Sequence, residues 1–170
     1  MKFRLIVSAL LVIILGPSFA LGQAYKNIVI SQPDAPVEIT SYEALYQPSS
    51  SYSRTREGIE HHVSYKNKTP RKIIAIEFGL VSFDIWNEFL DNMGGITMKL
   101  LGPGAEATSE WTSSRYGGFA FHTGVTYVSK VRFDDGEIWK ADLGAVIKEM
   151  KKIEADFDAS RLKKKEDPKS

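Results

Sequence analysis

Apolar residues recur at two-residue steps along most of this chain, and turn-forming residues separate these short stretches. The clearest stretch places Ile74, Ile76, Phe78 and Leu80 on one face of an extended segment, and residues 59–66 alternate in the same way. Side chains of a strand point alternately to its two faces, so this period predicts half-buried strands. We therefore predict a mainly β chain, in which about seven strands of residues 25–142 form an immunoglobulin-like antiparallel β-sandwich.

Two stretches of this region carry the main turn predictions. The pattern is irregular over residues 83–95, where Met93–Gly95 predicts a reversal of the chain. Asp135-Gly136 is the strongest hairpin signal. If these two residues form the turn, Phe133 faces Ile138 and Arg132 faces Trp139, the second as a cation–π pair. A slightly longer loop is the alternative, because a two-residue turn would place the carboxylates of Asp134 and Glu137 opposite each other, where they repel.

The hydrophobic period changes after Asp142. Apolar residues then recur at three- and four-residue steps, at Leu143, Val146, Met150, Ile153 and Phe157. This spacing predicts an amphipathic C-terminal helix over residues 143–162, with Asp142 as its N-cap and a polar tail over residues 163–170. We expect the apolar stripe of the helix to pack on the sandwich. Contact with a second copy, or with a membrane surface through Lys163–Lys165, is the alternative.

The first 24 residues have the layout of a secretory signal peptide. A basic head, Met1–Arg4, precedes an apolar run over Leu5–Gly16, and small residues follow. Cleavage is expected after Ala20 or Ala24. The apolar run is shorter than the roughly 20 residues that a membrane-spanning helix needs. We therefore expect a protein that is periplasmic or secreted and that does not stay inserted in a membrane. The absence of cysteine disfavours a disulfide scaffold of the kind common in animals, so we expect a bacterial protein.

The composition of the chain excludes several kinds of function. Lys and Arg number 22 and Asp and Glu number 21, which gives a net charge of +1 with the leader and −1 after loss of Lys2 and Arg4. A nearly neutral chain has no general attraction for nucleic acid. No cysteine is present, so disulfides, thiol catalysis and a lipid anchor on cysteine are excluded.

A family resemblance spans His62 to Asp142. It rests on Val63-Ser-Tyr-Lys-Asn67, Ile73-Ile-Ala-Ile-Glu-Phe78, Phe83-Asp84, Leu101-Gly-Pro-Gly104 leading to Trp111, and Val131-Arg-Phe-Asp-Asp-Gly-Glu-Ile-Trp139. These elements resemble the small extracellular immunoglobulin-like domains of the FxLYD kind. The resemblance implies a binding or accessory module and supplies no catalytic site.

Aromatic residues in the loops are the candidate binding residues. Tyr46, Tyr52, Trp86 and Tyr116 lie in or beside segments predicted to be loops, where an aromatic side chain either packs locally or binds a partner or sugar ring. Trp111 and Phe121, by contrast, fit core positions.

Other polar groups do not form a recognisable site. Oxygen donors cluster at Asp84, Asn87, Glu88, Asp91 and Asn92, but their spacing lacks the helix-loop-helix calcium pattern, so we expect them to serve turns. His61 and His62 are neighbours in a predicted strand and point to opposite faces, which disfavours a shared metal ion. No Gly-x-Ser-x-Gly nucleophile motif is present. We predict no metal site, no cofactor and no catalytic residue.

These observations together predict a non-catalytic binding or accessory module that acts outside the cytoplasm. Its contacts are expected at a sheet edge, at the loop aromatics or at the C-terminal helix, and its partner is expected to be an envelope or secreted protein. The alternative is a carbohydrate-binding or weakly calcium-binding module of the cell envelope, with a polysaccharide as one ligand.

Overall fold

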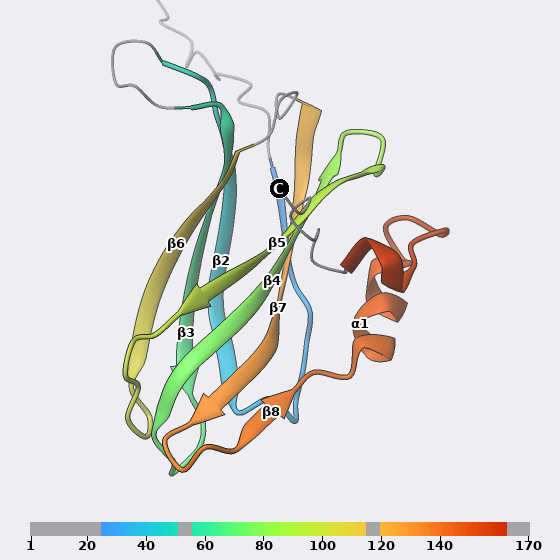
Figure 1. Cartoon of the computed structure of the whole chain (residues 1–170). Coiled ribbons are helices and arrows are strands. Elements are labelled where there is room, and N and C mark those ends of the chain that lie inside the picture. The colour runs from blue at the N-terminus through green and yellow to red at the C-terminus, as the bar shows by residue number, and fades with distance from the viewer. Residues whose placement is uncertain (1–24, 51–55, 115–119, 163–170) are drawn as a thin grey trace, which may run out of the picture.

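The chain folds into two packed β-sheets. The computed structural model describes residues 25–50, 56–114 and 120–162, so the predicted leader, the predicted tail, Tyr52 and Tyr116 lie outside the described residues. Its strands are β1 (Lys26–Val29), β2 (Val37–Gln47), β3 (Gly58–Asn67), β4 (Ile73–Asp84), β5 (Phe89–Thr97), β6 (Glu106–Ser114), β7 (Phe121–Phe133) and β8 (Ile138–Lys140). The larger sheet has the order β1-β7-β4-β5, with β8 also paired to β7, and the smaller sheet has the order β2-β3-β6 (Figure 1). The predicted mainly β sandwich is therefore confirmed.

The core lies between the facing sides of the two sheets. Tyr65 of β3 and Phe78 of β4 are fully buried there, with ring centroids 5.0 Å apart. The ring of Trp111 lies 5.7 Å from that of Phe78 and packs over Gly95, where a Cβ atom would approach the indole to 2.8 Å. Gly95 thus permits the close approach of Trp111 in the middle of a continuous strand. The predicted reversal at Met93–Gly95 is wrong, and residues 83–95 belong mostly to the β4–β5 hairpin.

Two register details also differ from the prediction. A bulge in β4 between Ile73 and Ala75 turns Ile73 into the core and leaves Ile74 half-buried. The buried position at this end of the strand is therefore one residue earlier than predicted. In the β7–β8 hairpin, Arg132 pairs with Ile138, and the Phe133 N–H donates to the Glu137 carbonyl at 3.0 Å.

The longer loop therefore forms in place of the two-residue turn. It spans residues 134–136 and ends on Gly136, whose φ of +93° suits glycine. Arg132 does not face Trp139. The cation–π contact is made instead by Arg71, whose guanidinium lies 3.7 Å from the centre of the Phe133 ring.

The predicted helix is correct at its start and too long at its end. Asp142 caps it, with Oδ1 accepting from the Gly144 N–H at 2.8 Å, but α1 covers only Leu143–Met150. A turn follows, and then a short 3₁₀ helix, η2, over Ala159–Leu162. No helix among the described residues has the length and apolar character needed to span a membrane.

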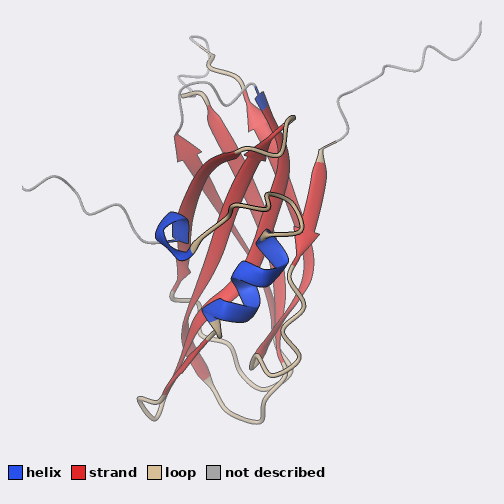
Figure 2. Cartoon of the chain, turned by 90° about the vertical axis from the view of Figure 1, so that its right-hand side faces the viewer, coloured by secondary structure: helices blue, strands red, loops and turns tan. Residues whose placement is uncertain are grey.

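α1 packs on the outer face of the larger sheet (Figure 2). Val146 and Met150 of the helix, and Phe157 beyond it, are fully buried against Val81 and Phe83 of β4. The helical period over residues 143–157 therefore arises from two segments that face the same sheet. Packing of the helix stripe on its own sandwich is confirmed for Val146, Met150 and Phe157, whereas Leu143 at the start of the stripe is partly exposed.

One side chain completes the edge of β7 between β1 and β8. The Gln32 amide donates to the Val128 carbonyl at 3.0 Å and accepts from the Val128 N–H at 2.7 Å. Gln32→Ala is expected to lower the free energy of unfolding by about 2 kcal/mol, because two backbone groups lose their partner. Gln32→Glu should also lose stability, since it keeps an acceptor for the Val128 N–H but sets a carboxylate oxygen against the Val128 carbonyl. Urea denaturation measures both, and equal stability of Gln32→Ala and wild type would contradict this role.

Candidate binding site

The β4–β5 turn is built around the carboxylate of Asp84. Its side chain is nearly buried, and Oδ1 accepts from the backbone N–H groups of Trp86 and Glu88, both at 2.8 Å. The Asp84 N–H in turn donates to the Glu88 carbonyl at 2.9 Å, and Asn87 takes the left-handed conformation with φ of +64°. The turn is therefore held by several hydrogen bonds, two of them to a carboxylate.

This turn holds two large apolar side chains in solvent. Ile85 is 51% exposed and Trp86 is 76% exposed. We refer to this pair as the Ile85–Trp86 tip. Exposure of an indole on a structured turn is unusual, because burial of its large apolar area would be favourable. The tip is therefore an exposed apolar pair on a structured turn, a feature that can anchor an interface.

Tyr46 does not join this tip, and Tyr52 and Tyr116 lie outside the described residues. Tyr46 is half-buried and packs against the core between the sheets, so local packing describes it better than exposure. The end of β2 and the start of β3 lie at the same end of the sandwich as the β4–β5 turn but on the opposite side of it (Figure 1). Of the four predicted binding residues, Trp86 is the described one that is available for contact. Trp111 and Phe121 occupy the predicted core positions.

Two of the predicted oxygen donors near the tip make hydrogen bonds within the protein. The Asp84 carboxylate accepts from its own turn, and Asn92 donates through its amide nitrogen to the Arg161 carbonyl. Asp91 and Asn92 belong to β5 and not to a loop. In the described ranges, no group of three or more His, Cys, Asp or Glu residues is arranged to hold a metal ion.

His61 occupies the core and not a surface site. It is fully buried, and its Nδ1 lies 2.9 Å from the Tyr42 hydroxyl, while Nε2 is buried without a hydrogen-bond partner. Burial, with a smaller effect of nearby His62, lowers the pKa of His61 to about 4. The imidazole is thus neutral at pH 7 and serves the structure.

This burial predicts a loss of stability in mild acid. Between the ordinary His pKa of 6.5 and the folded value of about 4, the unfolded chain binds a proton at His61 that the folded chain does not. The free energy of unfolding should therefore fall by about 2 kcal/mol from pH 7 to pH 5 through this group. Urea denaturation at pH 7 and at pH 5 should show this loss of stability in wild type and in His122→Gln. An equal loss in His61→Gln would exclude His61 as its source.

The structure also reveals a hollow that sequence reasoning missed. It has a volume of about 420 Å³ on the outer face of the larger sheet, beside α1 and η2, and Leu143 and Leu162 border it. Glycines at positions 79 and 94 form part of its lining; a Cβ at Gly79 would lie 2.1 Å from the Tyr127 ring. The signal available in the sequence was the presence of these glycines inside strands, which often marks a close approach.

Comparisons with known proteins support the fold alone. No family model matches this chain, and no curated protein matches it. A solved structure of a hypothetical protein from Peptoclostridium difficile 630 is similar, with a TM-score of 0.52 and 11% sequence identity. The alignment covers 70% of this chain and 93% of that chain.

Proposed function

We propose that this protein is a non-catalytic binding module that acts outside the cytoplasm, and that it contacts a partner protein through the Ile85–Trp86 tip. The observation that carries the proposal is the exposure of Trp86 and Ile85, 76% and 51%, on a turn clamped by the Asp84 carboxylate. The compartment follows from the signal-peptide pattern of residues 1–24. A rigid aromatic anchor loses little conformational freedom when it binds, which favours affinity.

Strand addition to a sheet edge is less well supported. At the open edge of β5, the Trp111 indole N–H donates to the Ile96 carbonyl at 3.3 Å, which occupies a group that an added strand would use. A bulge interrupts the β4–β5 pairing near the turn. At the edge of β2, the Ala44 N–H is bound by the Asn27 side chain at 2.9 Å. Contact through side chains is therefore favoured over contact through the backbone.

A sugar ligand is the second candidate for the same residue. An exposed indole offers a flat apolar face on which a sugar ring can stack, so Trp86 would also serve the carbohydrate-binding alternative. Calcium has less support, because Asp84 Oδ1 already accepts two hydrogen bonds from its own turn and, among the described residues, no group of three or more His, Cys, Asp or Glu is arranged to hold a metal ion.

The test is affinity capture from a detergent-solubilised envelope extract, with wild type, Trp86→Ala and Leu100→Ala as baits. Leu100 is a matched control because it is apolar and exposed and precedes Leu101, which bridges to Ile73 at the other end of β4. Wild type and Leu100→Ala should capture the same protein, and Trp86→Ala should capture at least about tenfold less, as expected of an anchor residue. Equal capture by Trp86→Ala would refute the proposal. A change in tryptophan fluorescence with envelope polysaccharide, without any captured protein, would replace it with the sugar-binding alternative.

A further inference from the structure

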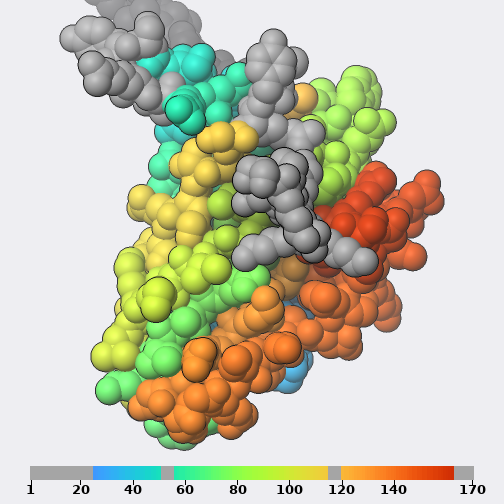
Figure 3. All heavy atoms as spheres, in the orientation of Figure 1, coloured from blue at the N-terminus to red at the C-terminus, as the bar shows by residue number. Residues whose placement is uncertain are grey.

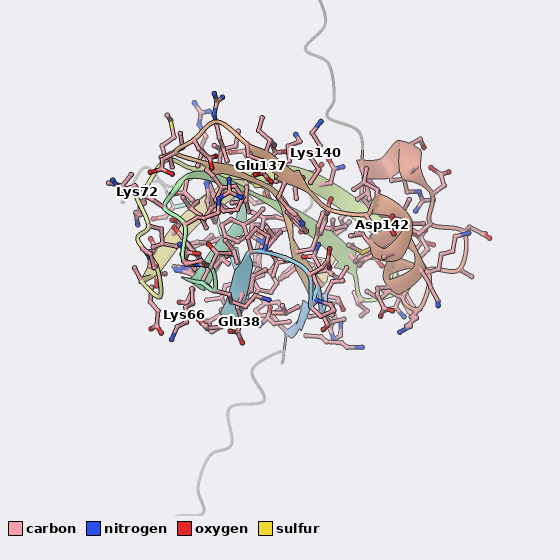
Figure 4. All side chains as sticks on the ribbon, turned by 90° about the horizontal axis from the view of Figure 1, so that it is seen from below. Glu38, Lys66, Lys72, Glu137, Lys140 and Asp142 are labelled. Atoms are coloured by element: carbon pink, nitrogen blue, oxygen red, sulfur yellow. The ribbon has the colours of Figure 1, made fainter. Side chains whose placement is uncertain are left out.

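A group of basic side chains lies on the outer face of the larger sheet, beside the β7–β8 hairpin. Trp139 of β8 packs toward the core, so its neighbours Ile138 and Lys140 face outward. The register places Lys140 opposite Lys130, and Ile138 opposite Arg132. Figure 3 shows this side of the molecule, with β7 and β8 in orange beside β4 in green. Seen from below, Lys140 lies on the opposite side of the sandwich from Glu38 and Lys66 (Figure 4).

The chain neutralises this group only in part. The Lys130 ammonium lies 2.9 Å from the Glu77 carboxylate. Within the described part of the chain, Arg132 and Lys140 form no ion pair. Two like charges directly opposite each other in a ladder destabilise a sheet, so the Lys130–Lys140 pair has a structural cost. A negatively charged partner on this face would remove that cost.

Exposed apolar side chains lie beside the basic ones, next to Lys140 on β8 and across Glu77 on and after β5. Ile138 of β8 is 48% exposed, and across the sheet Ile96 is 51% and Met98 is 82% exposed. Ile96 lies opposite Glu77, which itself lies opposite Lys130. We refer to this surface as the cationic face and define it by Lys130, Arg132, Lys140, Ile96, Met98 and Ile138.

We propose that the cationic face docks on the surface of a bilayer that contains anionic phospholipids. The charge of the face is complementary to such a surface, and each basic residue close to it contributes to binding. In a protein–protein interface the apolar residues gather at the centre and the polar ones at the rim. Here Lys140 and Ile138 share the edge strand β8, Lys130 and Arg132 lie beside them on β7, and Ile96 lies across Glu77 on β5, so the face has no apolar centre. Cations at the level of the phosphates and apolar side chains just below them suit the boundary of a bilayer.

The lysines that follow the last described residue in the sequence support this proposal. Leu162, the last described residue, borders the same hollow as Lys130. The sequence continues directly with Lys163, Lys164 and Lys165. Three more cations therefore follow from a point beside the cationic face.

This proposal uses a surface different from the Ile85–Trp86 tip, so the two can fail separately. Trp86→Ala should bind vesicles as wild type does, whatever its effect on protein capture.

Co-sedimentation with vesicles provides the first test. Vesicles of phosphatidylglycerol and phosphatidylcholine in equal parts should bind the full protein, vesicles of phosphatidylcholine alone should not, and binding should weaken from about 50 mM to about 500 mM NaCl. The double variant Arg132→Gln/Lys140→Gln should bind roughly 25-fold more weakly, about fivefold for each cation removed. The control Lys66→Gln/Lys68→Gln carries the same net charge and changes the other side of the molecule. Equal weakening of both double variants, or equal binding to both kinds of vesicle, would overturn the proposal.

A single fluorescent label provides the second test, which does not depend on charge removal. The chain has no cysteine, so Met98→Cys and Ser64→Cys each create one labelling site. Ser64 lies on β3, where its hydroxyl contacts Thr108 on the exposed side of the smaller sheet. An environment-sensitive dye at position 98 should shift its emission to the blue on phosphatidylglycerol vesicles, and the dye at position 64 should not. An unchanged emission at position 98, with protein bound, would also overturn the proposal.

Discussion

Asn67→Leu is expected to lower the free energy of unfolding by about 4 kcal/mol, because several buried polar groups lose their partner at once. Asn67 ends β3 and is fully buried. Its amide donates to the carbonyls of Arg71 at 2.7 Å and Gly102 at 3.0 Å, and Oδ1 accepts from the Thr69 N–H at 2.9 Å. One side chain therefore joins the β3–β4 turn to the loop before β6.

Urea denaturation measures this loss, and Asn92→Ala is its control. Among the described residues the Asn92 amide makes one hydrogen bond, to the Arg161 carbonyl, so its removal should cost about 1 kcal/mol or less. Similar losses for the two variants would show that Asn67 does not have the proposed joining role.

Phe157→Ala is expected to cost about 4 kcal/mol, the usual range for removing a fully buried phenylalanine ring. The ring lies 5.8 Å from that of Phe83 and 5.9 Å from that of Phe89, measured between centroids. It fills the space between the larger sheet and the segment that follows α1. Its loss should therefore also loosen the attachment of α1 to the sheet.

Hydrogen exchange of the α1 amides, together with chemical denaturation, checks this result. In Phe157→Ala these amides should exchange much faster than in wild type. Leu143→Ala removes a side chain that is 47% exposed and should leave exchange and stability nearly unchanged. Unaltered exchange in Phe157→Ala would show that α1 is held without this ring.

Local patterns predicted the elements of this fold better than their registers. Alternation identified the strands, because burial of one face imposes a period of two. It could not locate the bulge at Ile74 or the three-residue loop before Glu137, since both depend on pairing with a distant strand. The helix was predicted too long because Phe157, beyond the end of α1, returns to the same sheet and continues the helical spacing.

The sequence also predicted only part of the candidate site. Trp86 was singled out as a loop aromatic, and a turn role was expected for the neighbouring Asp84, which the structure confirms. Tyr46 is half-buried against the core, which its sequence context did not reveal. The cationic face was not predicted, because Lys130 and Lys140 become neighbours only through the observed β7–β8 register.

Site-specific photo-crosslinking in living cells tests the central proposal most directly. A photoreactive amino acid would replace Trp86 in one strain and Lys72, an exposed residue just before β4, in another. Position 86 should yield one discrete adduct with a second protein after illumination, and position 72 should not. The absence of any protein adduct at position 86, with the protein folded and exported, would contradict the proposed contact through the Ile85–Trp86 tip.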